Sequence, residues 1–95
     1  MPNSQYNRGR AAEYRAKRIL EVAGYTVART AGSHGCADLI AWNAQGFRLC
    51  QIKRGAANAS PAERETFALL SCPPGTAKEI WRFIAKRKPP VIEIL

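Results

Sequence analysis

An acid, an amide and a lysine lie near the middle of the chain at a spacing that could bring them together. Two apolar runs, residues 37–42 and 47–52, flank the sequence Asn-Ala-Gln-Gly, which is typical of a type I turn in a β-hairpin. Such a turn sets Asp38 opposite Gln51, and alternation along the strand puts Lys53 on the same face as Gln51. A register shifted by one residue would send Gln51 and Lys53 to the other face, so this geometry depends on the turn. Polar groups gathered at the open end of an apolar hairpin indicate a site.

The first element expected to position this site is a helix over residues 3–23 that ends at Gly24. Its apolar positions recur at helical spacing and define one face, which consists of Ala12, Ala16, Ile19, Leu20 and Ala23. Glu13 lies beside this face. Its carboxylate either points inward along the edge of the helix or pairs with Lys17 one turn later, and spacing by itself favours the surface pair.

The whole chain predicts one α/β domain over residues 1–95. Residues 25–30 are expected to form a strand ahead of the hairpin, and Ser60-Pro61-Ala62-Glu63 has the capping box and the proline that begin a helix reaching about Leu70. Residues 77–85 are expected to form a strand, and residues 91–95 a short final strand or a docked tail. The order αβββαβ(β), with large apolar side chains on both faces of the hairpin, indicates a mixed central sheet flanked by helices.

The composition favours a nucleic-acid partner. Fifteen Lys and Arg against seven Asp and Glu give a net charge of +8 on 95 residues, and so basic a small domain attracts polyanions. A charge that serves solubility or a membrane surface is the plainer alternative. Three cysteines without a C-x-x-C pair favour a reducing, intracellular setting in the cytoplasm or nucleoid. No membrane partner is expected, because no apolar run approaches the length of a span or of a signal-peptide core.

Basic side chains suited to phosphate contacts occur along the first helix. Arg8, Arg15 and Arg18 share one outer face, and Arg10 lies beside it, so this face is either a solvated surface or a stripe that neutralises phosphates. His34, the sole histidine, stands in the loop Ala-Gly-Ser-His-Gly without an identifiable partner. It is expected to contact DNA or to have no role, rather than to act as a base.

Four segments of the sequence resemble the archaeal-type (Hjc) Holliday junction resolvases of the PD-(D/E)xK nuclease superfamily. They are Arg8-Gly9-Arg10-Ala11-Ala12-Glu13 at the first helix, Val27-Ala28-Arg29-Thr30-Ala31-Gly32-Ser33, Asp38-Leu39-Ile40-Ala41, and Gln51-Ile52-Lys53 where the family has Glu-x-Lys. They occur in the family's order over nearly the whole chain. The resemblance implies a restriction-endonuclease-like core, and it reverses the interpretation of Glu13, because a helix-one glutamate helps to form the site in that family. Such resolvases occur in archaea and in viruses, and a virus or phage is a source that the sequence leaves open.

The resemblance implies a homodimeric, Mg²⁺-dependent endonuclease that cuts four-way DNA junctions, with Mn²⁺ able to substitute for Mg²⁺. The implied metal ligands are Asp38, Gln51, the backbone carbonyl of Ile52, and Glu13 directly, through water or at a second metal. Lys53 would orient or help to deprotonate the attacking water and stabilise the charge that develops at phosphorus. The catalytic set is therefore Glu13, Asp38, Gln51 and Lys53. The expected DNA contacts are Arg8, Arg10, Arg15, Arg29, Ser33, His34 and Arg54.

Two positions depart from the family pattern. Gln51 removes one negative charge near the metal, which should weaken Mg²⁺ affinity and lessen repulsion with Asp38. An active enzyme that needs more metal or prefers Mn²⁺ is expected. Tyr14 stands where the family often has Arg, so that one phosphate contact is either missing or supplied by Arg15.

Two alternative functions stay open. One is a nicking or repair nuclease that acts on flaps or other branched DNA, which a comparison of branched substrates would separate from a resolvase. The other is a structural junction-binding protein whose nuclease site has lapsed, with Gln51 as the lesion. The joint presence of Glu13, Asp38 and Lys53 favours an active enzyme. The dimer surface is also open: Trp81, Phe83 and residues 91–95 are candidates that could equally belong to the core.

Overall fold

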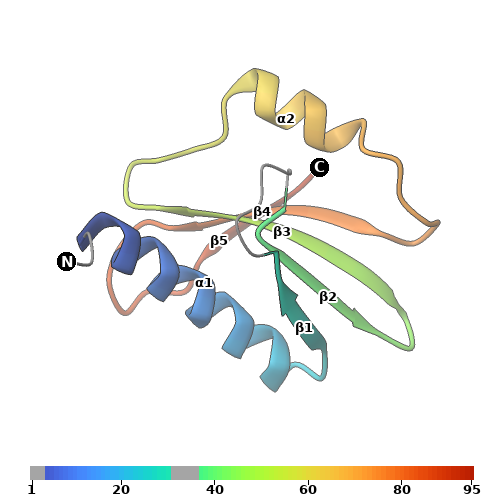
Figure 1. Cartoon of the computed structure of the whole chain (residues 1–95), viewed down its shortest axis with the longest axis horizontal. Coiled ribbons are helices and arrows are strands. Elements are labelled where there is room, and N and C mark those ends of the chain that lie inside the picture. Colours follow the sequence, from blue (N-terminus) through green and yellow to red (C-terminus); the bar gives the residue numbers. More distant parts are fainter. Residues whose placement is uncertain (1–3, 31–36) are drawn as a thin grey trace.

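The computed structural model describes residues 4–30 and 37–95, and side chains within residues 10–30 and 37–95. Its elements are α1 (Ser4–Val22), β1 (Thr26–Arg29), β2 (Leu39–Asn43), β3 (Gly46–Arg54), α2 (Pro61–Ala68), β4 (Ala77–Phe83) and β5 (Val91–Ile94). The predicted order αβββαβ is present, and the last segment is a strand rather than a tail (Figure 1).

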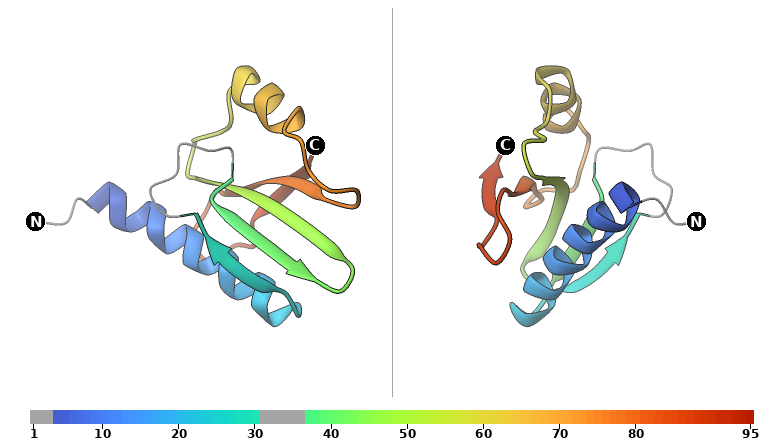
Figure 2. Two further views of the ribbon diagram at one scale, coloured as in Figure 1. Left: turned by 45° about the vertical axis from the view of Figure 1, so that its right-hand side comes forward. Right: turned by 90° about the vertical axis from the view of Figure 1, so that its left-hand side faces the viewer.

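The five strands form one mixed sheet in the order β1-β2-β3-β4-β5. β3 and β4 run parallel, and each of the other neighbouring pairs is antiparallel. A parallel pair needs a crossover connection, which α2 and its flanking loops supply. α1 packs on one face of the sheet, and α2 lies over the other (Figure 1, Figure 2). The prediction of a mixed sheet flanked by helices is confirmed.

The hairpin of β2 and β3 has the predicted register. Ile40 pairs with Leu49, and Leu39 pairs with Cys50. Leu39 and Cys50 belong to the core beneath α1. Because side chains alternate, Leu49 and Gln51 point toward the face that α2 covers. Burial raises the pKa of the Cys50 thiol to about 12, so this sulfur is a neutral core group.

The turn of the hairpin requires glycine at its last position. Gly46 has a φ of 143°, and a Cβ there would lie 2.9 Å from the carbonyl oxygen of Gly75 in the turn before β4. Asn43 Oδ1 accepts a hydrogen bond from the backbone N–H of Gln45 at 2.8 Å, which stabilises the turn from its first residue. These contacts fix the register that the site at the other end of the hairpin depends on.

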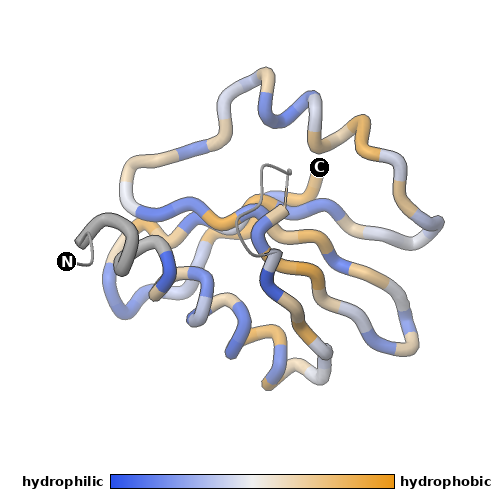
Figure 3. The backbone as a smooth tube through the Cα atoms, in the orientation of Figure 1, coloured by the Kyte–Doolittle hydropathy of each residue, from blue (hydrophilic) through white to orange (hydrophobic). Residues whose placement is uncertain are grey.

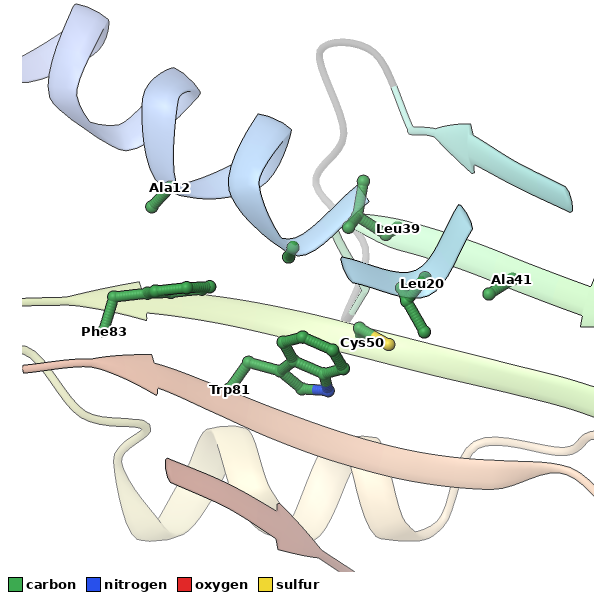
Figure 4. Packing of buried hydrophobic residues seen from close by; sticks show 8 residues of the cluster. Ala12, Leu20, Leu39, Ala41, Cys50, Trp81 and Phe83 are labelled. Atoms are coloured by element: carbon green, nitrogen blue, oxygen red, sulfur yellow. The ribbon is translucent and has the colours of Figure 1, made fainter. Parts of the chain in front are cut away.

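α1 packs on the sheet through small side chains spaced four residues apart. Ala12, Ala16 and Leu20 are buried, and they contact the sheet residues Leu39, Ala41, Cys50, Trp81 and Phe83 (Figure 4). Ile19 is 40% exposed and Ala23 is also exposed, so the prediction that both belong to the buried face is wrong. Ala12, Ala16 and Leu20 already cover the sheet, whereas Ile19 points away from it.

The second face has a smaller core. Phe67 of α2 is fully buried with Ile80 and Ala59, and Leu49 packs against them. Ser60 caps α2 by accepting from the N–H of Glu63, and the Glu63 side chain completes the predicted capping box. Within the described ranges, neither helix is long and apolar enough to cross a membrane.

Candidate active site

The Asp38 carboxylate is held beside β3, just before the first residue of β2. Its backbone N–H donates to the Cys50 carbonyl at 2.8 Å, and its Oδ2 accepts from the N–H of Ile52 at 2.7 Å. Burial raises the pKa of Asp38 above its ordinary value, and Glu13 raises it further, against lowering by the Ile52 hydrogen bond and by Lys53. A cation beside this carboxylate would therefore stabilise its charged form.

The side chain of Gln51, which precedes Ile52 on β3, has an unused acceptor. Gln51 is 8% exposed, and its Oε1 is buried without a hydrogen-bond partner among the described residues. Leaving a buried acceptor unpaired costs about 1–3 kcal/mol. A buried amide oxygen without a hydrogen-bond partner is the kind of oxygen that a hard cation accepts as a ligand.

The backbone of Ile52 contributes a further oxygen on the same side of β3. Its N–H points to Asp38, and the N–H and C=O of one strand residue point to the same side of the strand. β2 is paired only as far as Leu39 with Cys50. The Ile52 carbonyl therefore faces Asp38 beyond the end of the β2 ladder.

Lys53 points toward α2. Its Nζ lies 3.3 Å from Glu63 Oε2, and the other Glu63 oxygen accepts from the Ser60 N–H at 3.0 Å. One carboxylate thus caps α2 and holds the lysine. The sequence identified Glu63 only as part of the capping box, because its distance from Lys53 depends on the loop between β3 and α2.

Glu13 faces β1 and not its own helix. Its Oε1 accepts from Arg29 Nε at 2.9 Å, while Lys17 pairs with Glu21 at 3.8 Å. The surface pair of Glu13 with Lys17, which spacing alone favoured, is therefore wrong. Tyr14 packs beside this ion pair, with the Arg29 guanidinium 5.3 Å from the centre of its ring.

The predicted DNA-contacting residues lie in different places. Arg29 is beside Glu13, and Arg10 contacts Tyr14 with its guanidinium 5.7 Å from the ring. Arg15 faces away from Arg29, toward the turn between β4 and β5, where it donates to the Lys88 carbonyl at 3.1 Å. Arg54 lies at the end of β3 and is exposed. The predicted contacts Ser33, His34 and the side chain of Arg8 lie outside the described residues.

The acidic residues alone do not make a metal cage. Across residues 4–30 and 37–95, no group of three or more His, Cys, Asp or Glu side chains could hold a metal ion. The candidate donors in this part of the hairpin are the Asp38 carboxylate, the Gln51 amide oxygen and the Ile52 carbonyl, with Glu13 near enough to raise the pKa of Asp38. A cation here would be bound by mixed charged and neutral oxygens.

No protein-family model matches the sequence, and no curated protein matches it significantly. Among solved structures, the chain is similar to Hjc, a Holliday junction resolvase from the archaeal hyperthermophile Archaeoglobus fulgidus. The match covers 92% of this chain and 72% of that chain, with a TM-score of 0.76 and 20% sequence identity. The chain has the Hjc fold. The predicted α/β fold class is thereby confirmed, along with the structural resemblance to Hjc that the four sequence segments indicated.

Within the Hjc fold, the Ile52 backbone holds Asp38 beside β3, Gln51 precedes Ile52 on that strand, and Glu13 of α1 and Arg29 of β1 are near enough to shift the pKa of Asp38. Lys53 is adjacent in sequence but is held by α2. These contacts fix Asp38 to β3, Glu13 to β1 and Lys53 to α2.

Proposed function

We propose that this chain is a metal-dependent endonuclease that resolves four-way DNA junctions by paired, symmetric incision. The observation that carries the proposal is the Asp38 carboxylate held on the N–H of Ile52 in β3, where Ile52 stands between Lys53 and Gln51, whose buried Oε1 has no hydrogen-bond partner among the described residues. The Hjc fold and the net charge of +8 support a junction as the substrate and DNA as its chemical class.

The donor set fits Mg²⁺ or Mn²⁺. Asp38, the Gln51 amide oxygen and the Ile52 carbonyl would hold the ion, and Glu13 would contribute through the oxygen that Arg29 does not occupy or through water. When bound, the ion would supply positive charge that polarises the scissile phosphate and the attacking water. With one carboxylate and one neutral amide, affinity should be lower than with two carboxylates.

The protein side chains have separable roles in phosphodiester hydrolysis. Water adds to phosphorus, the bond from phosphorus to a sugar oxygen breaks, and negative charge develops on the phosphate oxygens. The Lys53 ammonium would stabilise that charge and orient the water, and Glu63 in the first turn of α2 would hold the ammonium in place. Arg29, aligned by Glu13 and Tyr14, would contact a neighbouring phosphate.

A homodimer completes the proposal, because a symmetric junction needs two sites for paired incisions. Trp81 and Phe83 are 1% and 4% exposed, so both are core residues and not dimer candidates. The remaining candidate is the C-terminal segment, residues 91–95, in which Val91, Ile92, Ile94 and Leu95 are all exposed. Light scattering with and without a junction would measure the assembly.

The deciding experiment is cleavage of a fixed four-way junction by the wild type, Asp38→Asn and Gln51→Glu in Mg²⁺, Mn²⁺ or chelator. Paired nicks at symmetric positions that need metal and are lost in Asp38→Asn are expected, and Gln51→Glu should lower the metal concentration for half-maximal cleavage. Equal cleavage of flaps and junctions would replace a resolvase with a general branched-DNA nuclease. Binding without cleavage by the wild type in both metals would mean a lapsed site.

A further inference from the structure

A pocket of about 500 Å³ opens on the α1 side of the sheet, next to the candidate site but not part of it. Three segments distant in sequence form it: the middle of α1, the end of β3 and the turn after β4 (Figure 1). Phe83 lies in the pocket lining and is 4% exposed, and its carbonyl accepts from the Gly55 N–H at 2.9 Å. The strand ends are therefore tied together beneath the pocket.

The pocket is basic. Arg15, Arg54 and Lys86 line it, and none of its lining residues is acidic. Arg15 is fixed, because its guanidinium lies 4.8 Å from the centre of the Phe83 ring and donates to the Lys88 carbonyl. Among the described residues, the side chains of Arg54 and Lys86 have no hydrogen-bond or ion-pair partner. Figure 3 colours the turn that follows Lys86 as strongly hydrophilic.

The pocket and Lys53 lie on opposite sides of β3. Arg54 follows Lys53 directly, and successive strand side chains point to opposite faces. Lys53 reaches α2, whereas Arg54 lines the pocket under α1. A DNA strand in contact with Lys53 must therefore pass around the end of β3 to reach the pocket, while two strands that diverge from a branch point would meet both sides directly.

We propose that the Arg15–Arg54–Lys86 pocket binds a backbone phosphate of a second DNA strand, distinct from the strand that is cut. The inference rests on the proposed function for its substrate class, and it assigns to Lys86 and the β4–β5 turn a role in distinguishing branched from linear DNA. The ligand chemistry is a phosphate group, which nucleic acid or a free nucleotide could each supply.

The test measures affinity for a four-way junction and for linear duplex as a function of salt, in chelator so that no cleavage occurs. The variants are Lys86→Ala, Arg54→Ala, and the matched pair Ala11→Glu and Ala11→Gln, which differ only by a charge at the rim of the pocket. Each lost phosphate contact should reduce the slope of log K against log salt by about 0.9 for the junction and leave the duplex slope unchanged. Ala11→Glu should bind the junction about tenfold more weakly than Ala11→Gln.

A second measurement identifies the source of the phosphate. Amide NMR shifts of Gly55 and residues 84–86 would be followed with inorganic phosphate, thymidine 5′-monophosphate and the junction. Saturation by the junction but not by millimolar free phosphate or nucleotide is expected. Equal slopes for all variants, or tight binding of the free nucleotide, would overturn the assignment. A wild type that binds through this pocket but never cleaves would refute the nuclease proposal alone, whereas a wild type that cleaves with unchanged slopes would refute the pocket alone.

Discussion

β3 carries a polar cluster at each end, and the two differ in how completely their groups are paired. Near its start, Arg48 Nε and Nη2 each donate to a different oxygen of Glu79 at 2.8 Å, and Trp81 Nε1 donates to the same carboxylate at 2.9 Å. The guanidinium also lies 5.0 Å from the centre of the Tyr25 ring. Near its end, the buried Gln51 oxygen has no partner among the described residues, and burial raises the pKa of Asp38.

The difference separates a structural cluster from the proposed functional one. Hydrogen bonds to Glu79 raise the pKa of Arg48, so the positive charge of Arg48 is stabilised within the protein. At the other end of β3, the described residues do not fully compensate the burial of the Asp38 carboxylate and the Gln51 oxygen. A bound cation would supply that compensation. Paired polar groups hold β3 to β4, whereas the Gln51 oxygen has no partner among the described residues and can accept a ligand.

The largest effect is expected from Lys53→Met. Losing the ammonium should lower the single-turnover cleavage rate of the junction by roughly 10²–10³-fold, because charge stabilisation in the transition state is lost. The unfolding midpoint should change little, since the partner Glu63 carboxylate is 45% exposed. Lys53→Arg, which keeps the charge, is the control. If Lys53→Met were fully active, Lys53 would have no role in cleavage, and the proposed site would not include the end of β3.

Next in size is the effect of Arg48→Met on stability. The Glu79 side chain is 3% exposed and would keep only weaker partners, so the free energy of unfolding in urea should fall by about 3 kcal/mol. Most of the loss should return in the double variant Arg48→Met with Glu79→Leu, because no buried charge then remains. Cleavage per folded molecule should be unchanged. A specific loss of cleavage in the folded variant would assign this cluster to function.

A smaller gain in stability is expected from Gln51→Leu in chelator. Replacing a side chain whose buried amide oxygen has no partner among the described residues with an apolar one of similar size should raise the free energy of unfolding by about 1 kcal/mol. Mn²⁺ should raise the unfolding temperature of the wild type but not that of the variant. If the variant were less stable in chelator, Gln51 would have a partner in solution and would belong with the paired cluster.

The smallest effect is the pH dependence that Asp38 contributes without metal. Because folding raises its pKa above the ordinary 3.8, its contribution to stability is complete below that pH and is lost as pH rises through the folded-state pKa. The stability of the wild type minus that of Asp38→Asn should therefore fall with rising pH and then level off. A difference that instead grew with pH would show a lowered pKa and an already compensated carboxylate.

The sequence by itself determined the hairpin and both helix positions. Turn chemistry at Asn43 and Gly46 was enough to predict the observed pairs of Leu39 with Cys50 and Ile40 with Leu49, since a hairpin register is a local property. The pairing of Asp38 with Gln51 lies beyond the last observed pair and stays a prediction. The capping box at Ser60 likewise located the start of α2. The resemblance in four short segments selected Glu13 against its local pairing preference, and the fold places it beside Arg29.

Only the tertiary structure decided the contacts between distant segments. Glu79 alternates with Trp81 and Phe83, but Ile80 is also apolar, so periodicity did not reveal which face of β4 was buried or that Arg48 would meet Glu79. The parallel register of β3 with β4 depends on the crossover through α2, which no local pattern specifies. The pocket and the Lys53–Glu63 contact depend on the same crossover, because it brings the ends of β3, α2 and β4 together in space.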